Sequence, residues 1–214
     1  MKKGLLLLTV FVFVLKVVSY GQLNGHNIKF DIGGLKDTIV YLAYYNGEST
    51  YVKDTAQVDN TGSFRFEGKE PLPQGVYFLA MGKPRPTRLF EFVVGETQAF
   101  SLVTRTLDYI KHMKVSGDLD NKLFFENMLF NMDRNMEVEP FVKTVQDSTL
   151  TEEKKKAARE QIKLVNDKVL AFQERIINEH PQTLTARILK ANKPIQIPAP
   201  PKLNDGSIDS TFQL

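Results

Sequence analysis

The spacing of hydrophobic residues changes once along this chain, near Ser116-Gly117, and the change divides it into two unlike parts. Before this point, short apolar runs alternate with polar residues between turn signals, which is typical of β-strands. After it, apolar residues recur every three or four positions, which is typical of amphipathic helices. We therefore predict the α+β class, with an antiparallel β-sandwich over residues 22–115 and an α-helical hairpin or bundle over residues 116–193.

Turn residues punctuate the strand part at regular intervals. The runs 28–32 and 38–45, separated by Gly33-Gly34, are expected to form a first hairpin. Asn46-Gly47 is a strong two-residue turn signal and starts a second hairpin. Regularly spaced short strands of this kind indicate an antiparallel sandwich or barrel.

The first predicted helix begins at an Asp118 or Asp120 cap and is ended or kinked by Pro140. Its apolar residues share one helical face. They are Phe125, Met128, Leu129, Met132 and Met136.

The second predicted helix has a capping-box spacing at Thr149 and Glu152 and should stop at His180, which precedes a proline. Its apolar residues repeat at alternating fours and threes, which forms a seam suited to packing on a partner helix. The seam consists of Ala158, Ile162, Val165, Val169, Phe172 and Ile176. A short third helix follows Pro181.

Residues 1–21 have the pattern of a cleaved export signal. Lys2 and Lys3 precede an apolar run that Lys16 interrupts, well short of the ~20 apolar residues that a membrane-spanning helix needs. We therefore expect an exported protein with no membrane span after cleavage. Removal of these three lysines lowers Lys+Arg from 28 to 25 against 25 Asp+Glu, so the mature chain is formally neutral. Neutrality argues against nucleic acid as a partner.

Residues 194–214 are predicted to be a linker and the start of a possible following domain. The proline-rich stretch KPIQIPAPPK, which starts at Lys193, is expected to run extended as a semi-rigid linker. The residues after it include Ile208, Phe212 and Leu214. We expect this stub to be the start of a following domain.

The run DTAQVDNTGSFRFEG at 54–68 resembles the strand-turn-strand signature of an uncharacterised N-terminal domain in exported Bacteroidota proteins. Phe90 to Gly95 is similar to the end of a strand in that domain, and Ser116-Gly117 with Asn121 is similar to its entry into the helices. NEHPQTL at 178–184 is similar to the turn before its last helix. The resemblance covers residues 23–192.

In that family the domain commonly precedes a helical segment and a thioredoxin-like domain of the thiol-disulfide interchange or peroxiredoxin-like group. The resemblance thus implies a periplasmic or cell-envelope location in a Gram-negative bacterium. The family's redox residues are the Cys-x-x-Cys of the thioredoxin domain, whereas this sequence contains no cysteine. No catalytic residue carries over, and we expect no enzyme activity in these residues.

The sequence offers few residues for chemistry. Its three histidines lie far apart without metal-ligand spacing, and phosphate-binding glycine motifs and the Gly-x-Ser-x-Gly elbow do not occur. We therefore expect no metal and no cofactor. The candidate ligand or partner contacts are a tyrosine of the second hairpin, two arginines of one loop and the seam of the long helix. They are Tyr44, Arg85, Arg88, Ile162, Val165, Val169 and Phe172.

Two functions remain open from the sequence. The first is a non-catalytic N-terminal module that docks, dimerises or positions a downstream thioredoxin-like domain, with the helix seam as the contact with a protein partner or a second copy. The alternative is a self-contained periplasmic or surface protein that binds a glycan or peptide through Tyr44 or the Arg85 loop.

Overall fold

The computed structural model describes residues 25–82, 86–193 and 207. The predicted export signal at 1–21, Arg85 and, apart from Ser207, the predicted linker and domain start at 194–214 lie outside the described residues.

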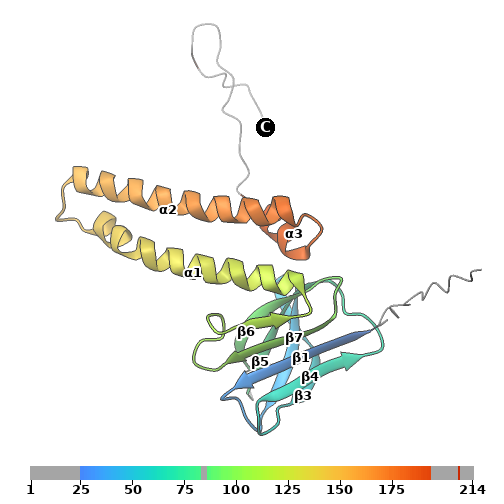
Figure 1. Ribbon diagram of the computed structural model, residues 1–214. Helices are drawn as coiled ribbons and strands as arrows, with labels where there is room; N and C mark the ends of the chain where they lie inside the picture. The colour runs from blue at the N-terminus through green and yellow to red at the C-terminus, as the bar shows by residue number, and fades with distance from the viewer. Residues whose placement is uncertain (1–24, 83–85, 194–206, 208–214) are drawn as a thin grey trace, which may run out of the picture.

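Within the described residues, eight strands form two four-stranded sheets that pack face to face, as predicted for a β-sandwich followed by helices (Figure 1). The first sheet has the order β4-β1-β7-β8, with bounds Ser63–Gly68, His26–Gly33, Ala99–Arg105 and Lys114–Ser116. The second has the order β3-β2-β5-β6, with bounds Ser49–Gln57, Ile39–Asn46, Gly75–Met81 and Thr87–Val94. Among the pairs described, β1 with β7 is parallel and the others are antiparallel.

The predicted first hairpin is wrong, because β1 and β2 belong to different sheets. The connection after Gly33 crosses from one sheet to the other, and Leu35 is buried beneath it. The β1 and β2 strands each turn their apolar side to the core between the sheets. Each strand therefore shows the same alternating pattern, whichever strand it pairs with. The hairpin at Asn46-Gly47 does form, between β2 and β3.

Aromatic rings fill the space between the sheets. Phe30 stacks on Phe64 with ring centroids 5.0 Å apart, and it meets Phe66 and Phe92 edge to face at 5.9 and 5.4 Å. All four rings are buried. Such offset and edge-on arrangements are favourable for aromatic pairs, and the contact between Phe30 of β1 and Phe92 of β6 joins the two sheets.

The helices are α1 (Leu119–Gln146), α2 (Glu152–Glu179) and α3 (Leu184–Ala191). The α1 and α2 helices run side by side and extend beyond the sandwich, while α3 folds back beside their inner end (Figure 1). Asp118 caps α1 by accepting a hydrogen bond from the Asn121 backbone N–H at 2.8 Å. Pro140 lies inside α1 and does not end it, because the helix continues to Gln146.

Two further helix predictions need correction. The cap of α2 is Thr151, which accepts from the Lys154 N–H, whereas Thr149 binds Asp147 in the preceding turn. The predicted apolar face of α1 is not one contact surface: Met132 and Met136 are 38% and 64% exposed. The side of α1 that packs on α2 is offset from it, because Phe125 near the start of the helix must face the sandwich core.

Candidate functional site

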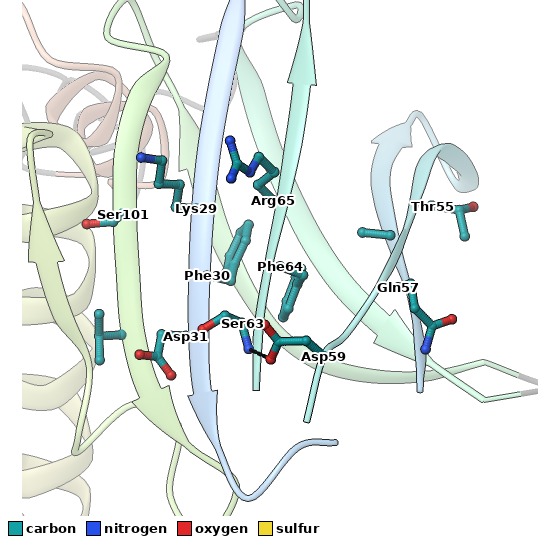
Figure 2. Close-up of a pocket in the computed structure, with 12 residues that line it drawn as sticks. Lys29, Phe30, Asp31, Thr55, Gln57, Asp59, Ser63, Phe64, Arg65 and Ser101 are labelled. Atoms are coloured by element: carbon teal, nitrogen blue, oxygen red, sulfur yellow. Dashed lines mark hydrogen bonds between the residues drawn. The ribbon is translucent and has the colours of Figure 1, made fainter. Parts of the chain in front are cut away.

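A groove with a volume of about 620 Å³ lies where the edge strand β4 of one sheet runs beside the edge strand β3 of the other (Figure 2). Its floor includes Phe30 and Phe64, and its rim carries polar side chains from β1, β3, β4 and β7. A concave site of this size lies in the range of small-ligand sites. It is the candidate binding site of the sandwich.

Strand register places the charged groups of the groove in two rows. Lys29 of β1 stands opposite Arg65 of β4 on one side and Ser101 of β7 on the other. One step along, Asp31 stands opposite Ser63 and Val103. Residues two apart on a strand are about 6.8 Å apart, so the groove has a basic row and, close to it, an acidic one.

Asp59 closes the acidic end of the groove and builds its corner. Its Oδ1 accepts hydrogen bonds from the Thr61 N–H at 2.8 Å, the Thr61 hydroxyl at 2.7 Å and the Ser63 N–H at 2.9 Å. These donors, the Thr61 hydroxyl first, hold the pKa of the Asp59 carboxyl below its usual range. Asp59 is therefore a structural group of the turn.

Lys29 and Asp31 are different, because within residues 25–82 and 86–193 neither side chain takes part in a hydrogen bond or an ion pair. Arg65 makes only an exposed contact with Glu67, whose Oε2 lies 3.5 Å from Nη1. Exposed pairs of this kind contribute little energy. The two basic groups of the groove are thus available to a ligand.

A second polar cluster lies on the outer face of the other sheet. The Arg88 guanidinium lies over the rings of Tyr45 and Phe78, 5.2 and 4.9 Å from their centroids, and its Nη1 is 2.8 Å from Glu91 Oε1. The Tyr45 hydroxyl donates to the same carboxylate oxygen at 2.6 Å. Burial, followed by the hydrogen bond to Glu91, raises the pKa of Tyr45. Arg88, a predicted contact residue, is therefore engaged within its own sheet.

Tyr44, the predicted platform residue, lies on the opposite side of β2. Its ring faces Tyr51 and Tyr77 at centroid distances of 5.9 and 5.8 Å and packs against the core between the sheets. Successive side chains of a strand alternate, so Tyr45 is the residue that reaches the outer face. The two predicted residues Tyr44 and Arg88 therefore do not form one site.

The predicted partner contacts on α2 lie against α1 of the same chain. Val165 is 3% exposed, and Ile162, Val169 and Phe172 on the same face are half-buried. Phe172 stacks on Phe130 of α1, with ring centroids 4.2 Å apart and planes 7° apart. The seam prediction was right about a helix partner, but that partner is the preceding helix.

A buried polar network joins the helices to the sandwich. The Asn121 side chain is fully buried; its Oδ1 accepts from the Val93 N–H at 2.9 Å, and its Nδ2 donates to the Val93 carbonyl at 2.7 Å. Nδ2 also donates to Asp118 Oδ2 at 2.7 Å. We call Asp118, Asp120, Asn121 and Thr185, with the Val93 backbone, the latch.

Asp120 extends the latch to α3. Its Oδ1 accepts from the Thr185 N–H, and its backbone carbonyl accepts from the Thr185 hydroxyl, both at 2.8 Å. Gly95 makes room for this carboxylate, since a Cβ at that position would lie 2.4 Å from Asp120 Oδ2. Sequence reasoning identified the cap but missed the latch, although the Ser-Gly-x-x-x-Asn spacing before the helix is a signal for it.

Metal-binding clusters and membrane-spanning helices are absent from the described part of the chain. No group of three or more histidine, cysteine, aspartate or glutamate side chains there could hold a metal ion. Among the described helices, none is both long and apolar enough to cross a bilayer. His26 contacts the Glu70 carbonyl at 2.9 Å, and His112 contacts Arg105.

Comparison with known proteins gives one family. Residues 26–124 match the family described as "Domain of unknown function (DUF4369)". The match spans all eight strands and the start of α1, so it includes Asp118, Asp120 and Asn121 of the latch. No curated protein and no solved structure matches the chain.

Proposed function

We propose that this chain is the non-catalytic N-terminal module of an exported, periplasmic protein of the thioredoxin-like family, and that it docks or positions a downstream domain. The observation that carries the proposal is the latch, which fixes the helices on a sandwich that contains a domain of unknown function. The sequence resemblance supplies the compartment and the kind of downstream domain.

The latch supports a positioning role because it makes the joint between helices and sandwich stiff. A buried donor or acceptor that loses its partner costs about 1–3 kcal/mol, so tilting α1 away from β6 would break several such bonds at once. The α1 and α2 helices have 28 residues each, which corresponds to an arm of about 42 Å. The Asp120–Thr185 bonds hold the start of α3, so the chain leaves the helices from a defined place.

The arm is also internally stiff. Phe130 and Phe172 stack across it, and Lys168 Nζ of α2 lies 2.7 Å from Glu137 Oε1 of α1. A partner that touches the outer end of the arm would therefore be held at a fixed distance from the sandwich.

The absence of cysteine in the sequence makes this testable by paired spin labels. Cysteines placed at Glu48, in the β2–β3 turn, and at Glu153, at the outer start of α2, would be labelled and their distance distribution measured by pulsed electron paramagnetic resonance. The proposal requires one narrow distribution that broadens when Asn121→Ala is added. Asn178→Ala, an exposed asparagine of α2, serves as the matched control. A broad distribution in the unaltered protein would refute positioning by a rigid arm.

The compartment and the downstream domain need a separate experiment. Immunoblotting of fractionated native cells with an antibody against this chain gives the size and location of the endogenous protein. The proposal predicts a periplasmic band at least ~10 kDa above the 24.4 kDa of the printed sequence, enough for another domain. A cytoplasmic band would contradict it.

The alternative function, binding of a glycan or peptide, is favoured by a different observation. The groove between β3 and β4 offers uncommitted charged groups, whereas Tyr44 packs inward. Binding there is compatible with positioning by the arm, because the groove and the latch use different residues.

A further inference from the structure

We propose that the groove binds an extended peptide by strand addition to the open edges of β3 and β4, with a carboxylate of the peptide held by Lys29 and Arg65. This goes beyond the positioning role and does not depend on it. Free backbone groups point into the groove, and its shape and charge suit an extended acidic ligand.

The backbone groups of β4 that face the groove are identified by alternation. The Asp59 N–H donates to the Ser63 carbonyl at 3.1 Å, so the Ser63 backbone points away from β1. Arg65 and Glu67 share this direction, because groups two residues apart on a strand point the same way. Their N–H and C=O groups are therefore presented at the edge of the sheet.

The outward-facing backbone groups of β3 follow from alternation as well. The Val58 N–H donates to the Thr38 carbonyl at 2.8 Å, which directs the Val58 backbone toward the β2 side. Gln57 has the opposite parity and presents its backbone N–H and C=O away from β2, toward the groove that it lines. Thr55 has the same parity, but its N–H donates to Asp54 Oδ1 at 2.7 Å, so only its carbonyl is open to a new strand. Exposed edges of this kind are templates for another strand.

The groove has room for such a strand. The β3 and β4 strands are joined at the Asp59 corner and stand apart above it, with Thr55 on one side and Arg65 on the other (Figure 2). An added strand needs about 4.8 Å from its neighbour.

Charge indicates the chemistry of the peptide. Lys29 and Arg65 are directly opposite each other, and like charges in that position repel. Lys29 has no acidic partner in the described residues, and the Ser101 position adds a hydroxyl on its other side. A carboxylate between the two cations would relieve the repulsion and form charge-assisted hydrogen bonds.

Asp31, in the acidic row, indicates where a cationic group of the peptide would lie. It lies two residues from Lys29, and an extended peptide spans the same distance with two residues. A cationic group two residues from the carboxylate would therefore lie near Asp31. The groove suits short peptides with a free C-terminus or an acidic side chain.

The test uses the chain with 15N labelling, titrated with tetra-alanine and followed by 1H–15N correlation spectra. Strand addition predicts saturable shifts of the Gln57 and Arg65 amides. The C-terminally amidated peptide should bind about tenfold more weakly, because it lacks the charged acceptor. A tetra-alanine with N-methylated internal amides keeps the charges but loses backbone donors, and it should also bind about tenfold more weakly.

Variants locate the carboxylate site. Lys29→Gln and Arg65→Gln should each weaken the free-acid peptide about tenfold while leaving the amidated peptide unchanged. Lys36→Gln, an exposed lysine in the β1–β2 connection, is the matched control and should change neither. All three changes are on exposed positions, so folding is checked simply by retention of the remaining amide peaks.

Three results would overturn the proposal. The first is no shift of the edge amides at millimolar peptide. The second is an equal response to acetate, which would make the groove an anion site only. The third is a set of edge-amide shifts that grows with protein concentration in the absence of peptide, which would show that a second copy of the chain occupies the edge.

Discussion

Removing the Asn121 side chain tests the latch most directly, since its amide joins α1 to β6. In Asn121→Ala, the N–H and the C=O of Val93 both lose their partners, and Val93 is fully buried. Each unsatisfied buried group costs about 1–3 kcal/mol, so we expect a loss of about 4 kcal/mol in the free energy of unfolding. This is a large part of the 5–15 kcal/mol typical of a domain.

Urea unfolding monitored by circular dichroism measures this loss. With a denaturant slope of about 2 kcal/mol per molar, a loss of about 4 kcal/mol lowers the urea midpoint by about 2 M. Asn178→Ala, on the exposed side of α2, should change stability by less than about 0.5 kcal/mol. A loss below about 1 kcal/mol in Asn121→Ala would refute the idea that the latch is tight and dry.

A second substitution at the same place separates acceptor from donor. Asn121→Asp keeps an oxygen for the Val93 N–H but cannot donate to the Val93 carbonyl, and it sets a second carboxylate beside Asp118. Burial already raises the pKa of the Asp118 carboxyl. The variant should therefore be less stable than Asn121→Ala at pH 7 and recover partly on acidification, when one carboxyl binds a proton.

Three other predictions concern the sandwich and the arm. Gly62→Ala should cost about 2–3 kcal/mol in urea unfolding, because Gly62 has φ of 95° and an added Cβ would lie 2.4 Å from the Ile32 carbonyl oxygen; a loss below about 1 kcal/mol would mean that this corner relaxes. Phe172→Ala removes half of the stacked ring pair in the arm and should broaden the Glu48–Glu153 label distance as well as lower the melting temperature; an unchanged distance distribution would contradict that. The pKa of Asp59 is lowered in the fold, so its ionised carboxylate stabilises the fold above the unfolded pKa of about 3.9, and this stabilisation is lost as pH falls through the lower folded pKa. Asp59→Asn should therefore flatten the decline of the urea midpoint below about pH 4. Equal slopes in both proteins would refute this role.

The sequence predicted the fold class because burial on one side of an element leaves a periodic trace. Phe64 and Phe66 alternate with polar residues, and their side chains are buried together on one face of β4. The end of α2 at His180 followed from the proline after it. Such local signals depend on neighbours within four residues, which the sequence shows directly.

The pairing of strands left no such trace. The β1 and β7 strands lie side by side although 65 residues separate the end of one from the start of the other. Alternation of apolar and polar residues shows only that one side of a strand is buried and does not identify the neighbouring strand. The prediction therefore paired β1 with β2, whereas β1 lies between β4 and β7. The α2 seam was recognised correctly, but its apolar residues could not reveal that α1 of the same chain covers it.

The candidate site was even less visible in the sequence. Lys29, Arg65 and Ser101 come from three strands and were not singled out, since each by itself is an ordinary exposed residue of an alternating pattern. Asp120 and Thr185 likewise meet only because α3 folds back beside the start of α1.

The sequence by itself determined the order of strands and helices, the apolar faces of the strands and of α2, several turns and caps, and the lack of any thiol chemistry in these residues. The tertiary structure decided which strands pair, which helix covers the seam, how Asn121 locks the arm, and that two cations meet at an open sheet edge. The reason is physical: hydrophobic periodicity records whether a residue is buried, whereas partner choice depends on contacts between residues far apart in the chain.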